Sequence, residues 1–158
     1  MSGQRQDYIL RQIELLRQAV KRSINKRPDP ELDESLLLSF HLQEKLFPLP
    51  PAEFLALPMD EQIAALRKNE SREAGNVKVR LYAALLAETA RLYEHRDQAD
   101  LAAGARQMGL YAALSVAIDD STDSEANALA RELLAAIDVK TLHASVIALL
   151  EQLRDSPA

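Results

Sequence analysis

Apolar residues recur at intervals of three and four along most of this chain, a period that fits an α-helix and not a strand. One such stripe predicts an amphipathic helix over about residues 6–26. It consists of Ile9, Ile13, Leu16, Val20 and Ile24. Alanine and leucine are abundant and glycine occurs four times, so helix is also the favoured backbone conformation. The sequence therefore predicts an all-α protein.

The same periodicity predicts about seven to eight helices, packed as antiparallel hairpins in a bundle-like arrangement or in the alternative arrangement discussed below. We expect a single domain over residues 1–158, because a chain of this length buries roughly 68–70% of its unfolded surface. A central hairpin is predicted at about 77–118 and a C-terminal hairpin at about 123–155. Apolar residues surround most of the central hairpin, Leu101 among them, so we expect it in the core.

We expect one connection between helices to be packed and another to be a polar loop. The stretch at about 47–59 contains four prolines, and its apolar residues are too many for a flexible linker, so we expect a packed connection with short helical turns. Residues 69–76 are polar and include Gly75, which favours a loop.

The central hairpin resembles a tetratricopeptide unit over about 40 residues. The resemblance is carried by Leu86, Ala90 and Tyr93, then Asp97 as the N-cap of a second helix, then Ala99 and Ala102. Arg106 stands where that family has an aromatic residue, and no proline closes the unit. The resemblance implies a tetratricopeptide-like packing of the hairpins as the alternative to a bundle, and a helical scaffold that binds a protein or peptide.

A second resemblance is carried by residues 7–14, which read Asp-Tyr-Ile-Leu-Arg-Gln-Ile-Glu. This segment is similar to the opening helix of a family of small uncharacterised bacterial all-helical proteins. It covers under a fifth of the chain. The resemblance implies a bacterial protein and brings no activity with it.

Composition excludes several classes of chemistry. Cysteine is absent, so disulfide bonds, thiolate catalysis and Cys-ligated zinc are excluded. No Gly-rich phosphate loop or nucleophile-elbow motif occurs. Residues 1–12 lack the apolar core of a secretory signal, and the apolar runs are far shorter than the roughly 18–20 residues that cross a bilayer. We therefore expect a cytoplasmic protein without a transmembrane segment or a cofactor.

An enzymatic alternative rests on two pairs of carboxylates. Glu31 and Glu34 form one pair, and Glu70 and Glu73 form the other. This spacing resembles the one by which helical nucleotide pyrophosphohydrolases hold magnesium between facing helices. The first pair also fits the opening turn of a helix, where acids interact with the helix dipole. The alternative is a small Mg-dependent all-α nucleotide hydrolase.

A second alternative rests on the uneven charge. Residues 1–27 carry seven Lys and Arg against two acids, a net +5, while residues 28–158 carry twelve against twenty-two, a net −10. The basic N-terminal helix therefore offers a surface for an anionic polymer or a membrane, through Arg11, Arg17, Lys21, Arg22 and Lys26. The overall acidity disfavours nucleic acid.

The preferred hypothesis is a non-enzymatic interaction module. Tyr8, Leu15 and Ala19 form a second apolar stripe on the first helix, which either another helix of the chain or a second copy must cover. This stripe predicts self-association, with a homodimer as the expected state. A groove between hairpins would hold a partner protein or peptide. Its candidate aromatics are Tyr82, Tyr93 and Tyr111, which alternatively lie in the core with their hydroxyls at its edge.

Overall fold

The computed structural model of the chain describes residues 3–23 and 30–155, without the side chains of residues 3–6, 19, 20, 22, 23 and 30. Eight α-helices and one 3-10 helix, with no strand, make up this described part, which confirms the predicted all-α class. They are α1 (Gly3–Ser23), α2 (Pro30–Glu44), α3 (Pro51–Leu55), α4 (Met59–Arg67), α5 (Arg72–His95), α6 (Ala99–Asp119), α7 (Ser124–Ala135), η1 (Val139–Thr141) and α8 (Ala144–Asp155).

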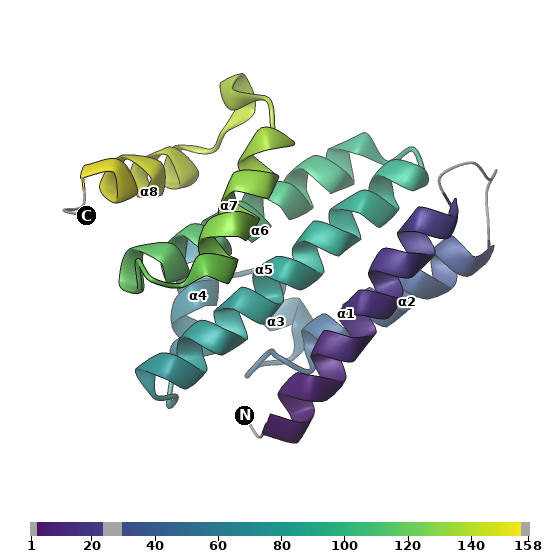
Figure 1. The fold of residues 1–158 in the computed structure, drawn as a ribbon, viewed down its shortest axis with the longest axis horizontal. Coiled ribbons are helices and arrows are strands. Elements are labelled where there is room, and N and C mark those ends of the chain that lie inside the picture. The colour runs from purple at the N-terminus through teal and green to yellow at the C-terminus, as the bar shows by residue number, and fades with distance from the viewer. Residues whose placement is uncertain (1–2, 24–29, 156–158) are drawn as a thin grey trace.

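Helix α5 forms the centre of the fold. It contacts α1, α2, α4, α6 and α7, and in Figure 1 it crosses the middle of the molecule with α1 and α2 on one side and α6 and α7 on the other. Fourteen of its 24 residues are buried, more than one face of a helix would supply. A single cluster of buried apolar side chains runs from α1 to α8 around it.

Helices α5 and α6 form the predicted antiparallel central hairpin and approach each other closely (Figure 1). Small side chains on α6 allow this approach. A Cβ at Gly109 would lie 3.3 Å from Leu86 Cβ and 3.3 Å from Leu133 Cδ1, which leaves no room for a larger residue. The hairpin spans residues 72–119, which is longer than a tetratricopeptide unit of about 34 residues.

The expected polar loop at residues 69–76 is wrong for most of its length. Helix α5 begins at Arg72, and the Ser71 hydroxyl caps it by accepting a hydrogen bond from the backbone N–H of Ala74 at 3.1 Å. Only residues 68–71 connect α4 and α5, with Asn69 in the left-handed region at φ 64°. Gly75 and Asn76 resemble loop residues in the sequence, because the residues that they contact, Arg67 and Asp119, belong to other helices.

The expected N-cap at Asp97 is also wrong. Asp97 has φ 58°, so it ends α5 in the left-handed conformation that often terminates a helix. Helix α6 begins at Ala99, after Gln98, which makes no side-chain cap. The tight connection itself is as expected.

The C-terminal helices do not form the predicted hairpin. Helices α7 and α8 each pack mainly against α6, and α8 extends to the far end of the molecule from α1 (Figure 1). A 3-10 turn separates them. Gln107 of α6 holds this turn, because its Nε2 donates to Thr141 O at 3.1 Å and its Oε1 accepts from the His143 N–H at 3.2 Å.

The Pro-rich connection at 47–59 is packed, as expected. Phe54 of α3 is fully buried and stacks on Phe47 with ring centroids 4.0 Å apart. The ring of Tyr82 from α5 meets both of these rings edge-on, with centroids 5.7 and 5.8 Å away. This aromatic cluster anchors a segment whose prolines cannot extend a helix.

By length and composition alone, α6 resembles a membrane-spanning helix, with a mean hydropathy of 1.2. In this fold 61% of its apolar window is buried against other helices, which is the pattern of a core helix. No other helix among residues 3–23 and 30–155 meets the same criteria.

Substitutions at two glycines of α6 should change the free energy of unfolding in opposite directions. Gly109→Val should lower the free energy of unfolding by about 1–3 kcal/mol, because the added atoms have no space against α5 and α7. Gly104→Ala should raise it by roughly 0.5–1 kcal/mol, since a Cβ there meets nothing within 4 Å and alanine favours helix. Urea unfolding of both variants checks this; a destabilised Gly104→Ala would contradict it.

Candidate functional site

An apolar groove lies between α2, α3, α5 and α6 and has a volume of ≈ 320 Å³. Helices α2 and α6 supply its sides, and α5 runs beneath it. Its walls are mostly apolar, which is typical of sites that bind apolar ligands or side chains. They are formed by Phe40, Leu55, Leu86, Tyr93, Leu101 and Ala105.

The rims of the apolar groove carry two large side chains that the fold leaves uncovered. Leu55 of α3 is 56% exposed and Leu101 of α6 is 51% exposed. The rings of Phe40 and Tyr93, which line the same groove, lie 6.2 Å apart and are tilted by 45°. Gly104 keeps the α6 side open, because it places no side chain there. The result is an apolar surface with an aromatic wall and two leucine rims.

The floor of the apolar groove is polar. Gln43 of α2 and Thr89 of α5 line it, and both are buried. Gln43 Nε2 donates to Thr89 Oγ1 at 3.0 Å and to Ser39 Oγ at 3.4 Å, and the Ser39 and Thr89 hydroxyls are hydrogen-bonded to each other. A convergent polar group at the base of an apolar pocket is typical of binding sites.

The three candidate tyrosines lie in different surroundings. Tyr82 and Tyr111 are buried in the core, and burial raises the pKa of the Tyr82 phenol, whose hydroxyl donates to Gln62 Oε1 at 2.9 Å. Tyr93 is half-buried and lines the apolar groove. Tyr93 is therefore the candidate aromatic that the structure places in a groove.

The second apolar stripe on α1 is partly uncovered. Tyr8 is 37% exposed, with Lys45 Nζ 4.4 Å from its ring centroid, and Leu15 is 50% exposed. The side chain of Ala19 lies outside the described residues. The described part of the chain thus covers Tyr8 and Leu15 incompletely.

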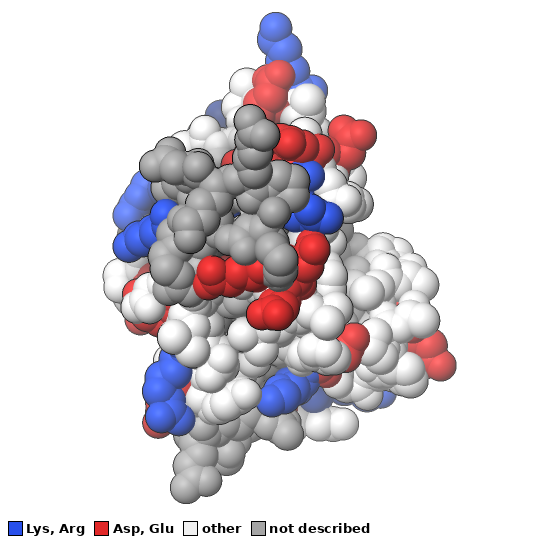
Figure 2. Space-filling view, turned by 90° about the vertical axis from the view of Figure 1, so that its right-hand side faces the viewer, with Lys and Arg blue, Asp and Glu red and all other residues white. Residues whose placement is uncertain are grey.

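The basic residues of α1 whose side chains are described differ in their surroundings. Arg17 turns toward α5, where its Nε donates to Glu88 Oε1 at 3.0 Å. Lys21 is exposed and Arg11 largely so, while the side chain of Arg22 and the whole of Lys26 lie outside the described residues. Figure 2 shows Lys and Arg interspersed with Asp and Glu on the face beside the end of α1, so the charges drawn there form no continuous basic patch.

Glu88 is a buried carboxylate that the sequence did not single out. It is 1% exposed, and Arg91 Nη1 also donates to its Oε1 at 2.5 Å. A charged pocket of about 450 Å³ lies beside it, lined by Arg17, Lys21, Glu88, Arg91, Glu94, His95 and Arg106. Because the arginines pair with Glu88, Glu94 and Glu132, the chain itself largely neutralises the charged pocket.

The two pairs of carboxylates considered for magnesium are far apart. Arg96, at the C-terminal end of α5, pairs with Asp33 of α2 at 3.0 Å, so Glu31 and Glu34 lie near that end. Glu73 is in the first turn of α5, roughly 30 Å away along the helix. Glu70 pairs with Lys78 at 3.7 Å. Within the described residues, no group of three or more acidic or histidine side chains is arranged to hold a metal.

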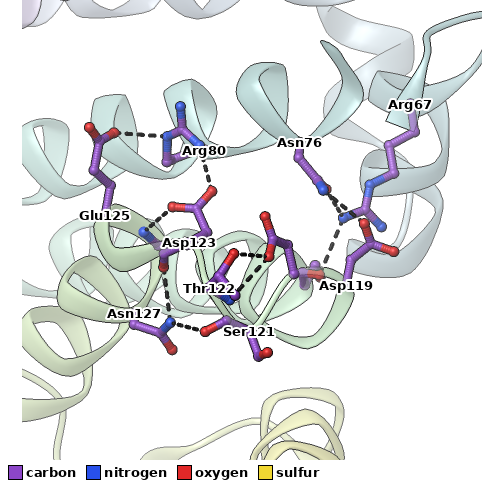
Figure 3. A network of polar contacts seen from close by, with 12 residues as sticks. Arg67, Asn76, Arg80, Asp119, Ser121, Thr122, Asp123, Glu125 and Asn127 are labelled. Atoms are coloured by element: carbon purple, nitrogen blue, oxygen red, sulfur yellow. Dashed lines mark hydrogen bonds and ion pairs between the residues drawn. The ribbon is translucent and has the colours of Figure 1, made fainter. Parts of the chain in front are cut away.

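A polar network joins the start of α5 to the end of α6. Figure 3 shows Arg67 and Asn76 pointing toward Asp119, with Arg67 Nη2 donating to Asn76 Oδ1 at 2.9 Å and Asn76 Nδ2 donating to Asp119 Oδ2 at 2.8 Å. Nearby, Arg80 pairs with Asp123 at 2.5 Å and Glu125 at 3.0 Å (Figure 3). Each of these three acids has a basic or amide partner within the chain, so the network connects the helices to one another.

Comparison with known proteins gives no relative: no protein-family model, no curated protein and no solved structure matches the chain significantly. The two resemblances carried by residues 7–14 and by the central hairpin therefore stay predictions.

Several residues of the apolar groove could not be recognised from the sequence. Leu101 was expected in the core, because periodicity marks an apolar face without telling whether a neighbour covers it. Gln43 and Thr89 did carry a signal. Both are polar residues among the apolar positions of their helices, which marks a buried polar contact or a binding site.

The polar network predicts a dependence of stability on pH. Hydrogen bonds from Asn76 and Arg72 hold the pKa of Asp119 below its ordinary value. A lowered pKa in the folded state means that Asp119 stabilises the fold at neutral pH and that this contribution is lost as the pH falls through the folded-state pKa. The melting temperature of Asp119→Asn should therefore fall less steeply than that of the wild type below about pH 4.

Thermal melts followed by circular dichroism at several pH values check this prediction. Asp155→Asn is the matched control, because Asp155 is exposed at the end of α8. It should follow the wild-type curve. Equal slopes for wild type and Asp119→Asn would show that the network contributes nothing to acid sensitivity.

Proposed function

We propose that this protein is a non-enzymatic interaction module that binds a segment of a partner protein in the apolar groove. The observation that supports this proposal is the pair of half-exposed leucines, Leu55 of α3 and Leu101 of α6, that line an aromatic-walled groove. Apolar surface gathered around a concave site is typical of protein-interaction sites.

The energetic gain from covering this surface is appreciable. Fully burying a leucine is worth about 1.5–3 kcal/mol, so covering the exposed half of Leu55 and of Leu101 adds roughly 1 kcal/mol each. Phe40 and Tyr93 add partly exposed aromatic surface to the same groove. Such a set of side chains suits an amphipathic segment that places apolar residues on successive turns.

The alternatives have less support. The carboxylate pairs that a magnesium hydrolase would need lie at opposite ends of α5, and Arg17 of the basic helix is paired with the buried Glu88. The apolar groove is lined by one charged residue, Asp100, at the start of α6. A basic residue beside the apolar segment of the partner would complement it.

Selection of helical peptides from a displayed library tests the proposal, because it requires only the folded protein as bait. Peptides selected on the wild type should bind with a Kd on the order of 10 μM in calorimetry. Leu101→Glu should weaken this binding at least about tenfold, because it places a charge on the apolar rim.

Val139→Glu is the matched control. Val139 is 65% exposed on η1 and does not line the apolar groove, so the added charge should leave peptide binding unchanged. Equal binding by the wild type and Leu101→Glu, with both folded, would contradict a function at this groove.

Self-association through α1 is a separate prediction. If a second copy covers Tyr8 and Leu15, light scattering over a tenfold range of concentration should show a dimer that Leu15→Glu converts to a folded monomer. A wild-type protein that is monomeric throughout would remove the homodimer and leave the proposal for the apolar groove untouched.

A further inference from the structure

The floor of the apolar groove contains a side-chain oxygen that no described residue uses. Gln43 is 6% exposed and lines the groove. Its Nε2 donates to Ser39 and Thr89, whereas its Oε1 accepts no hydrogen bond from the described part of the chain. The groove therefore contains a buried amide with one free acceptor.

The orientation of this amide follows from the hydroxyl protons. Thr89 Oγ1 donates to Leu85 O at 2.7 Å, so the Ser39 hydroxyl is the donor in the hydrogen bond between Ser39 and Thr89. Neither hydroxyl has a second proton for an amide oxygen. The Gln43 NH₂ group must therefore point at the two hydroxyls, and its oxygen must point away from them.

The free oxygen is not enclosed. Glu88 Oε2 is the only fully buried side-chain nitrogen or oxygen without a partner among the described residues, so Gln43 Oε1 keeps some accessible surface, and Gln43 lines the groove. Phe40, Leu86 and Tyr93 stand around the same cavity and offer apolar contacts. An amide oxygen in apolar surroundings favours a ligand that is apolar in bulk and brings one donor.

We infer that the apolar groove holds a tryptophan side chain of the partner protein, whose indole N–H donates to Gln43 Oε1. This inference rests on the function proposed above. Indole is a large apolar ring with one donor and no acceptor. A phenol or an aliphatic hydroxyl also brings an acceptor, for which the cluster of Ser39, Gln43 and Thr89 has no free donor. An ammonium group brings three donors, of which the floor of the groove accepts one, so it fits the rim near Asp100 better than the floor.

The size and openness of the groove agree with this occupant. Its volume of ≈ 320 Å³ accommodates one large side chain, and Gly104 leaves the α6 side open to a ring. Tryptophan is also among the residues most enriched at the centres of protein interfaces.

Two small probes test the hydrogen bond directly on the wild-type protein. The first is N-acetyl-tryptophanamide, and the second is the same compound with a methyl group on the indole nitrogen. The chain contains no tryptophan, so probe fluorescence is the only indole signal in the titration. Methyl NMR shifts of Leu55, Leu86 and Leu101 locate the bound probe.

The unmodified probe should bind weakly, with a Kd on the order of 1 mM, and shift the methyl groups of the groove. The methylated probe should bind about fivefold more weakly, because it lacks the donor. Gln43→Met should reduce the affinity for the unmodified probe to that of the methylated one and leave the affinity for the methylated probe unchanged. The comparison of probes on the wild type needs no variant, so it holds even if Gln43→Met fails to fold.

Equal affinity of the wild type for the two probes would overturn the inference, and so would binding without shifts at Leu86 and Leu101. Either result leaves the proposed function to its own test. If the selected peptides still lose affinity for Leu101→Glu, the groove is a binding site whose anchor is another residue. If they do not, the proposed function fails as well.

Discussion

Helix α5 is buried on nearly every side, and the rest of the fold is arranged around the polar groups that it carries inside. Asn76, Tyr82, Glu88 and Thr89 all lie on this helix and are buried. Because an unpaired polar group inside a protein is destabilising, each of them needs a partner from another element. The partners come from α1, α2, α4 and α6: Arg17, Gln43, Gln62 and Asp119. These contacts fix the position of each surrounding helix along α5, which apolar packing alone specifies less sharply.

The apolar groove is a consequence of the same arrangement. Helices α2 and α6 both pack on α5, and the polar contact of Thr89 with Gln43 holds α2 in place on one side. Neither helix covers the outer part of the surface between them, where Leu101 and Leu55 stay exposed. The apolar groove therefore arises because α2 and α6 both pack against α5 but leave the surface between them uncovered.

The sequence predicts the helices well because their apolar periodicity is a local property. The all-α class, the central hairpin and the packed connection at 47–59 follow from it. The start of α5 does not, because Asn76 is helical through contacts with Arg67 and Asp119, and Asp119 lies 43 residues away in the chain. The apolar groove is still harder to predict from the sequence. Periodicity places Leu101 on an apolar face, but only the arrangement of helices in space decides whether that face is covered.

Helix α8 is attached to the rest of the fold mainly through one interface, with α6. Its main contacts are with α6, and Val146 is its only buried residue among residues 144–155. Val146 joins the shared apolar cluster at its edge, whereas the other helices contribute most of the buried side chains around α5, so we expect α8 to open before that core does. The backbone amides of α8 would then exchange with solvent faster than those of α5. We therefore expect α8 to open and close at a lower free energy than global unfolding requires.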